Sequence, residues 1–108
     1  MNYPVNRHSA VDRDIIALAG WIAQDNREAA FRFVEAAEET ILSLGEMPGK
    51  GSPKHLRSRR LKNVRSWAVS GFPKHLIFYE FRESEVYVLA VLHGARNYSP
   101  LLQKRTSV

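Results

Sequence analysis

Three residues beyond the last apolar stretch of the chain could together carry out chemistry on RNA. His93, Arg96 and Tyr98 lie within a few positions of one another. Histidine titrates in the range needed for proton transfer, arginine can hold a phosphate through two parallel hydrogen bonds, and tyrosine can stack on a base. Cutting RNA through its 2′-hydroxyl needs such groups, so an endoribonuclease site is one hypothesis for these residues.

The alternative interpretation of the same residues is structural, and we favour it for His93. This histidine follows an apolar segment directly and precedes Gly94, where the chain is expected to turn. A histidine in that position can hydrogen-bond the backbone of the turn, and Tyr98 can serve in packing. Arg96 lies beyond the predicted strand and is the better candidate for contact with a target.

Positive charge is concentrated in one part of the chain. The formal net charge is +5, and Met47 to Tyr79 contains eight Lys or Arg residues with no Asp or Glu, whereas the remainder is mildly acidic. Such a segment indicates a polyanion or an acidic partner, the alternative being a solvated connector. We predict that Arg96 and five cations of this segment contact the target, namely Arg57, Arg59, Arg60, Lys62 and Arg65.

Length and composition indicate one ordinary domain over residues 1–108, with 44% hydrophobic and 25% charged residues. Cysteine is absent, which excludes disulfides, and His8, His55 and His75 show no metal-ligand spacing, so we predict neither metal nor cofactor. The N-terminus lacks the apolar core of a signal peptide, and no apolar run approaches the roughly 20 residues of a membrane span. We therefore expect a cytoplasmic protein.

The first elements predicted are a short strand and a helix. Tyr3–Arg7 is expected to form an edge strand or a strand start, because its proline cannot donate a backbone hydrogen bond. Ser9 is the expected N-cap of the first helix, and apolar residues recur at helical spacing from there until the helix ends near Gln24.

A second helix follows after only a few residues. It is expected to begin at Asp25 or Asn26 and to end where Gly45 can adopt the left-handed conformation and Pro48 prevents continuation. Because the connection between the two helices is so short, we expect them to form an antiparallel hairpin.

The second half of the chain is predicted to be mainly β-structure. Met47–Arg60 is rich in Pro and Gly and is expected to be a loop. Strands are expected at Val64–Val69, His75–Phe81 and Val86–Leu92, with a turn at Ser70–Pro73. The last strand is almost wholly apolar and should be central. The prediction is an α+β fold of order β-α-α-β-β-β, with the hairpin packed on a mainly antiparallel four-stranded sheet.

This element order and three local patterns resemble the RelE/ParE superfamily of type II toxin–antitoxin modules, in particular its ParE-like branch. Ile22–Ala30 is similar to the family's run at the bend of the hairpin, although Arg27 replaces the usual proline. Leu76–Tyr79 is similar to a characteristic strand, although Glu80 stands where arginine is common. Val91–Asn97, "VLHGARN", resembles the C-terminal motif of ParE-type members and is the most specific of the three.

The resemblance implies a bacterial toxin that arrests growth and is neutralised by a cognate, ParD-like antitoxin. A ParE-like toxin inhibits DNA gyrase by binding, without bond chemistry of its own. The alternative is a RelE-like, ribosome-dependent mRNA endonuclease, and a third class is a module that has lost toxicity and only binds its partner and operator DNA. The resemblance also implies that operator DNA is contacted only through the antitoxin. Candidates for the antitoxin contact are Trp21, Phe31 and Phe33, with core packing as the alternative.

Overall fold

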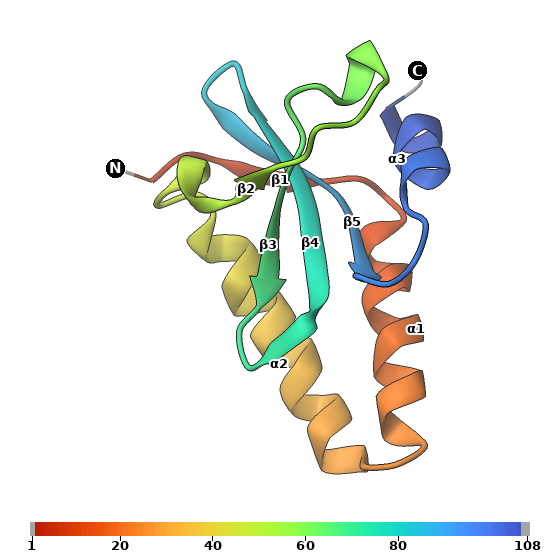
Figure 1. The fold of residues 1–108 in the computed structure, drawn as a ribbon. Helices are drawn as coiled ribbons and strands as arrows, with labels where there is room; N and C mark the ends of the chain where they lie inside the picture. The colour runs from red at the N-terminus through yellow and green to blue at the C-terminus, as the bar shows by residue number, and fades with distance from the viewer. Residues whose placement is uncertain (1, 107–108) are drawn as a thin grey trace.

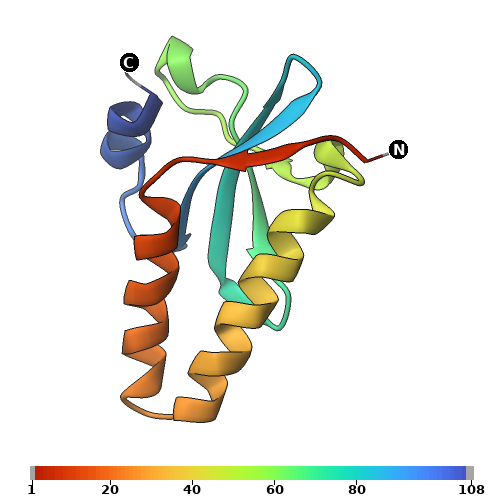
Figure 2. The same ribbon diagram turned by 180° about the vertical axis from the view of Figure 1, so that it is seen from behind.

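The computed structural model describes residues 2–106. Its elements in chain order are β1 (Val5–Arg7), α1 (Val11–Ala23), α2 (Arg27–Ser43), β2 (Ser52–Pro53), β3 (Arg65–Val69), β4 (Phe72–Arg82), β5 (Glu85–His93) and α3 (Ser99–Thr106), with short 3₁₀ turns at Pro48–Lys50 and Arg59–Leu61. Helices α1 and α2 form an antiparallel hairpin that packs along one side of the sheet (Figures 1 and 2). The predicted α+β class and the helical hairpin are confirmed.

The sheet has the order β1-β5-β4-β3-β2 within residues 2–106. Strand β1 is parallel to β5, and the other neighbouring pairs are antiparallel. The sheet is therefore five-stranded rather than four-stranded, because Ser52–Pro53 pairs with the start of β3 inside the segment expected to be a loop. A two-residue strand is too short to show an alternating pattern, so the sequence gives no sign of it.

The turn between β3 and β4 is shorter than predicted. Gly71 has a φ of 79°, a conformation that suits glycine, and the chain enters β4 immediately afterwards at Phe72. Phe72 already pairs with Val69, so the strand begins before His75, where we expected it. A register shift between Ala68 and Val69 accommodates this tight connection.

The ends of the helices show one confirmed and two wrong predictions. Asn26 caps α2, its side chain accepting the Ala29 backbone N–H at 3.0 Å. Ser9 is not the cap of α1, because the cap position is Ala10, whose N–H is bound by the Nδ1 atom of His8 at 3.0 Å. Gly45 is not left-handed. Instead, a Cβ there would lie 2.6 Å from a backbone oxygen of the N-terminal segment, so close packing demands the glycine.

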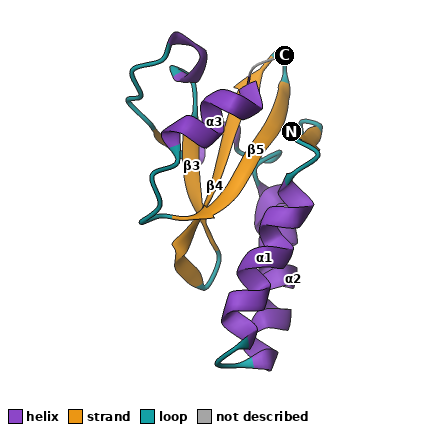
Figure 3. Cartoon of the chain, turned by 90° about the vertical axis from the view of Figure 1, so that its right-hand side faces the viewer, coloured by secondary structure: helices purple, strands orange, loops and turns teal. Residues whose placement is uncertain are grey.

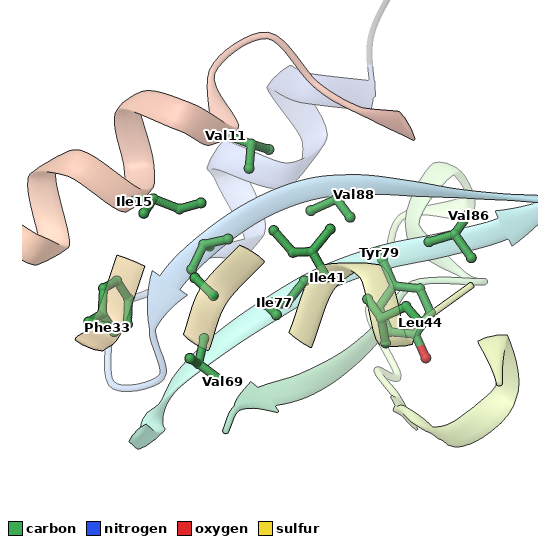
Figure 4. Packing of buried hydrophobic residues seen from close by; sticks show 12 residues of the cluster. Val11, Ile15, Phe33, Ile41, Leu44, Val69, Ile77, Tyr79, Val86 and Val88 are labelled. Atoms are coloured by element: carbon green, nitrogen blue, oxygen red, sulfur yellow. The ribbon is translucent and has the colours of Figure 1, made fainter. Parts of the chain in front are cut away.

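The core consists of two clusters, one on each face of the sheet. On the hairpin face, Phe33, Ile41 and Leu44 of the α2 segment pack with residues that include Ile77 and Tyr79 of β4 (Figure 4). The opposite face is covered by a second cluster, which contains Leu61, Val64, Phe78, Leu89, Ala90, Leu92 and Leu102. Because residues of β5 enter both clusters, the prediction of a central, doubly covered strand is confirmed.

Helix α3 completes the second face and is tied to α1 by an ion pair. It packs on β5 and on the Arg59–Leu61 turn (Figure 3), with Leu102 completely buried. The Nη2 atom of Arg105 donates to Oδ1 of Asp14 at 2.9 Å, and its Nη1 donates to the Leu89 carbonyl at 3.1 Å. Oδ2 of Asp14 accepts the Val91 N–H at 3.0 Å. The Asp14–Arg105 ion pair therefore joins α1, β5 and α3. It does so at a part of β5 that β1 does not reach.

Candidate functional site

The cationic segment, defined here as Lys54–Arg65, is anchored by two apolar residues. Leu61 and Val64 are completely buried in the second cluster. The Lys54 N–H donates to the Val64 carbonyl at 2.8 Å, and this hydrogen bond closes the segment into a loop. The apolar side chains thus point inward, and four of the predicted target-binding cations are exposed: Arg57, Arg59, Arg60 and Lys62.

Arg65 differs from these four because it is half-buried and bonded to the backbone. Its Nη1 atom donates to the carbonyl oxygens of Gly51 at 2.7 Å and Gly49 at 3.3 Å. The guanidinium therefore holds the 49–51 segment against the start of β3. Arg65, which we predicted as a target contact, therefore has an evident structural role.

A second candidate site is a cavity of about 450 Å³ beside α1. Ala17, Leu18 and Trp21 form its helix wall, and residues of β4, β5 and the following turn form the other. The cavity brings together His93 and Arg96, predicted for RNA chemistry, and Trp21, predicted for an antitoxin contact. Arg96 is exposed at this site. Asp14 also lines the cavity, but its carboxylate is paired with Arg105.

The proposed endoribonuclease trio is not assembled as a group. His93 accepts the Ala95 backbone N–H on its Nδ1 atom at 3.1 Å, which confirms the structural interpretation of this histidine. Tyr98 packs instead on Phe78 in the second cluster, with ring centroids 4.5 Å apart. One nitrogen of the histidine is thus engaged, and Tyr98 does not line the cavity that His93 and Arg96 share.

His75 was not among the predicted site residues, yet it lies beside His93 in the cavity, with ring centroids 5.3 Å apart. Its ring also meets Phe33 edge-on at 5.0 Å. The Nδ1 atom is buried and has no hydrogen-bond partner within residues 2–106. Burial, and secondarily the nearby His93, lowers the pKa of His75 below its ordinary value.

The lowered pKa of His75 predicts a pH-dependent stability. The unfolded chain binds a proton on this histidine below about pH 6.5, whereas the folded chain resists it, so the free energy of unfolding should fall as pH drops from 7 to 5. Urea unfolding followed by circular dichroism at several pH values should show a smaller fall for His75→Phe. His55→Gln, at an exposed loop histidine, is the matched control and should retain the wild-type profile. Identical profiles for all three proteins would contradict this prediction.

Glu80, the departure from the family's strand pattern, is a buried carboxyl group on β4. The residue is 5% exposed, and its Oε2 atom lies 3.5 Å from the guanidinium of Arg82. Burial raises the pKa of Glu80, and the Arg82 charge partly offsets the rise. Glu80 is thus a buried carboxyl group beside Arg82 rather than a free anion on the surface.

The three aromatic residues predicted for the antitoxin do not share one environment. Trp21 is 71% exposed and Phe31 is 70% exposed on the hairpin, whereas Phe33 is completely buried. The prediction for Phe33 does not hold in this structure, because α2 turns Phe33 toward the sheet together with Ala30 and Ala37. The helical spacing of apolar residues predicts a buried face made of Ala30, Val34, Ala37, Ile41 and Leu44. All of these are buried except Val34, which is half-buried.

Two general properties of the described chain bear on function. Within residues 2–106, no group of three or more His, Cys, Asp or Glu side chains is arranged to hold a metal ion. None of the helices in that range is both long and apolar enough to cross a membrane.

The sequence contained only a partial signal for the residues that we missed. The polar stretch after β4 indicates a hairpin, but continuing the Arg82–Glu85 pairing without a shift would place His75 opposite Leu92, and a register shift between Phe78 and Tyr79 brings it opposite His93. The role of Asp14 had no signal at all, because an acid in the first turn of a helix is common and its partner lies 91 positions away.

Comparison with known proteins gives a family. The sequence profile described as "ParE toxin of type II toxin-antitoxin system, parDE" matches residues 5–98. A solved structure described as "Chromosomal ParDE TA system from P. aeruginosa" superposes with a TM-score of 0.66 at 13% identity, covering 84% of this chain and 95% of that chain. Such a low identity supports the fold alone, and no curated protein matches the sequence. Because the profile covers most of the chain, the protein belongs to the ParE toxin family of type II toxin–antitoxin systems.

Proposed function

We propose that this protein acts in the cytoplasm as a toxin that binds DNA gyrase and stalls it, without bond chemistry of its own. The observation that carries the proposal is the cationic segment, whose buried Leu61 and Val64 hold it in place while its charges face outward. A surface of fixed, like-signed charges suits a target that is itself bound to DNA. Membership of the ParE family supports the same target class.

A cognate antitoxin is the second part of the proposal. Trp21 and Phe31 expose most of their surface on the hairpin, and large exposed aromatic residues are typical anchors of protein interfaces. We expect an amphipathic helix of the antitoxin to cover them. In this arrangement the antitoxin carries the contact with operator DNA.

The alternative is a ribosome-dependent mRNA endonuclease, for which the neighbourhood of His93 and Arg96 is the favouring observation. Acid–base cleavage needs one group to accept a proton and another to donate one. The only other histidine in the cavity among residues 2–106 is His75, whose Nδ1 atom is buried. The binding function therefore remains the proposal that the geometry supports better.

A test uses purified gyrase, plasmid DNA and two variants with equal loss of charge. The wild-type toxin should cause cleaved DNA to accumulate, and Arg57→Gln/Arg59→Gln should raise the concentration needed about tenfold, because charges at an interface centre drive binding. The control Lys74→Gln/Lys104→Gln removes two exposed cations elsewhere and should act like wild type. Equal potency of all three proteins would exclude the cationic segment as the contact surface.

The same proteins should be expressed in cells without antitoxin. The proposal expects induction of the DNA-damage response before any loss of mRNA. Early, codon-dependent mRNA cuts with unaffected gyrase would establish the endonuclease instead. Normal growth despite soluble expression would favour a module that has lost toxicity.

A further inference from the structure

A small pocket of about 240 Å³ lies at the end of the sheet, separate from the cavity beside α1. Three stretches of chain that are distant in sequence form it: the 48–53 segment, the residues that lead into β3, and the end of β4. Its walls include Pro48, Pro53, Lys62, Asn63, Arg65 and Phe81. The residues that line it include two cations, and none of those described is acidic.

The pocket is held by hydrogen bonds to a completely buried side chain. The hydroxyl group of Tyr79 accepts the Gly51 N–H at 2.9 Å and donates to the Pro48 carbonyl at 2.7 Å. Arg65 adds its two bonds to the carbonyls of Gly49 and Gly51. The wall formed by residues 48–51 is therefore fixed before any ligand arrives, which reduces the ordering cost of binding.

The positive groups of the pocket suit a phosphate. Arg65 uses one terminal nitrogen for the two carbonyls, and a guanidinium has five N–H donors, so the second terminal nitrogen can bind an anion. The ammonium group of Lys62 is exposed beside it, and the Asn63 amide can donate a further hydrogen bond. These donors come from one short stretch of chain and converge on one space.

Phe81 distinguishes a nucleotide from other anions. Its ring is 38% exposed and packs edge-on against Tyr3, with centroids 4.9 Å apart. That contact leaves part of an oriented aromatic surface open in the same pocket as the cations. A carboxylate of an acidic peptide would use the cations alone, whereas a nucleotide would use both the cations and the ring.

We propose that this pocket binds a nucleotide of a nucleic-acid strand, with its phosphate on Lys62 and Arg65 and its base against Phe81. The inference goes beyond gyrase binding, because it gives the toxin a direct contact with nucleic acid. DNA held by gyrase and RNA share this chemistry, and the probes below separate them. Binding to nucleic acid alone is measured without gyrase, so its failure leaves the gyrase proposal standing, and the reverse also holds.

The test measures fluorescence anisotropy of labelled dT12 and rU12 with the full chain at several salt concentrations. Lys62→Gln should weaken binding about fivefold to tenfold and reduce the salt slope by about one, as expected for loss of one phosphate contact. Phe81→Leu should weaken binding about tenfold with an unchanged salt slope, because it removes stacking but no charge. Lys74→Gln, which removes an exposed cation outside the pocket, is the matched control and should stay within about twofold of wild type.

The outcomes are unambiguous for both parts of the site. If both variants weaken binding, the proposed nucleotide site is supported. Whichever of dT12 and rU12 binds more tightly then identifies the ligand as DNA or RNA. Equal weakening by Lys62→Gln and Lys74→Gln would show a general charge effect and overturn the proposal. Displacement of the oligonucleotide by polyglutamate as efficiently as by unlabelled dT12, or a Phe81→Leu variant of wild-type affinity, would leave a non-specific anion site and also overturn it.

Discussion

Replacing Asp14 with alanine is expected to lower the free energy of unfolding by about 3 kcal/mol, because it leaves a largely buried guanidinium without its counter-charge. The side chains of Asp14 and Arg105 are only 10% and 11% exposed. The same substitution removes the acceptor of the Val91 N–H on the central strand. One change therefore costs an ion pair and a backbone hydrogen bond at the junction of α1, β5 and α3. Urea unfolding followed by circular dichroism measures the loss.

The same helix provides the matched control for this prediction. Asp12 also pairs with an arginine, Arg7, at 2.9 Å, but the Asp12 side chain is 70% exposed. Asp12→Ala should therefore cost less than about 1 kcal/mol. Hydrogen exchange should also show faster opening of α3 in Asp14→Ala alone. If the two alanine variants lose equal stability, the junction does not hold α3 as described.

Replacing Gly51 with alanine should destabilise the fold by about 3 kcal/mol through a direct clash. A Cβ at this position would lie 2.5 Å from the hydroxyl oxygen of Tyr79 and 2.8 Å from a carbon of its ring. Tyr79 is completely buried, and its hydroxyl group is hydrogen-bonded to both Gly51 and Pro48. The ring therefore cannot move away from an added Cβ. The backbone of Gly51 is extended, so the effect is steric and not conformational. Thermal and urea unfolding both measure it.

Two further variants make this prediction specific. At Gly49, two positions earlier, no described atom lies within 4 Å of an added Cβ, so Gly49→Ala should be nearly neutral. Tyr79→Phe should itself cost about 1–3 kcal/mol, because it leaves buried backbone groups without partners. In the double variant Gly51→Ala/Tyr79→Phe the shortest contact is relieved, so a coupling of about 1 kcal/mol or more is expected. Strict additivity of the two losses would contradict the clash.

The helices and strands that were predicted correctly are those whose residues show a periodic spacing or a run of β-forming residues. Both helices and strands β3 to β5 have a periodicity or a run of β-formers that physical spacing explains. Strand β1 was expected near its true position, but its parallel partner is β5, about 80 residues later, and no local pattern specifies that pairing. The cap of α1 was misassigned because serine is a common N-cap residue. In the structure, the His8 ring accepts the Ala10 N–H at the start of the helix instead.

The sequence predicted which charged residues of the candidate site are exposed, but it did not predict how the site residues are arranged in space. Exposure of Arg57, Arg59 and Lys62 follows from a polar segment rich in turn residues, which a sequence shows directly. The grouping of Trp21 with His93 around one cavity depends on how α1 crosses β5, which is a property of the assembled layers. The prediction that Phe33 contacts the antitoxin failed for a related reason. The angle at which α2 packs on the sheet decides which of its residues are buried, and Phe33 is one of them.

The central place of β5 determines when this chain can become a folded toxin during its synthesis. β5 separates β1 from β4 in the sheet, so the first strand has nothing to pair with until residues 86–88 exist. A nascent chain that stops before Glu85 contains the residues of the helical hairpin but lacks the strand against which α1 packs. Long-range pairing of this kind is slow to form. Truncated translation products should therefore lack the complete sheet, and the full fold should form only late in synthesis.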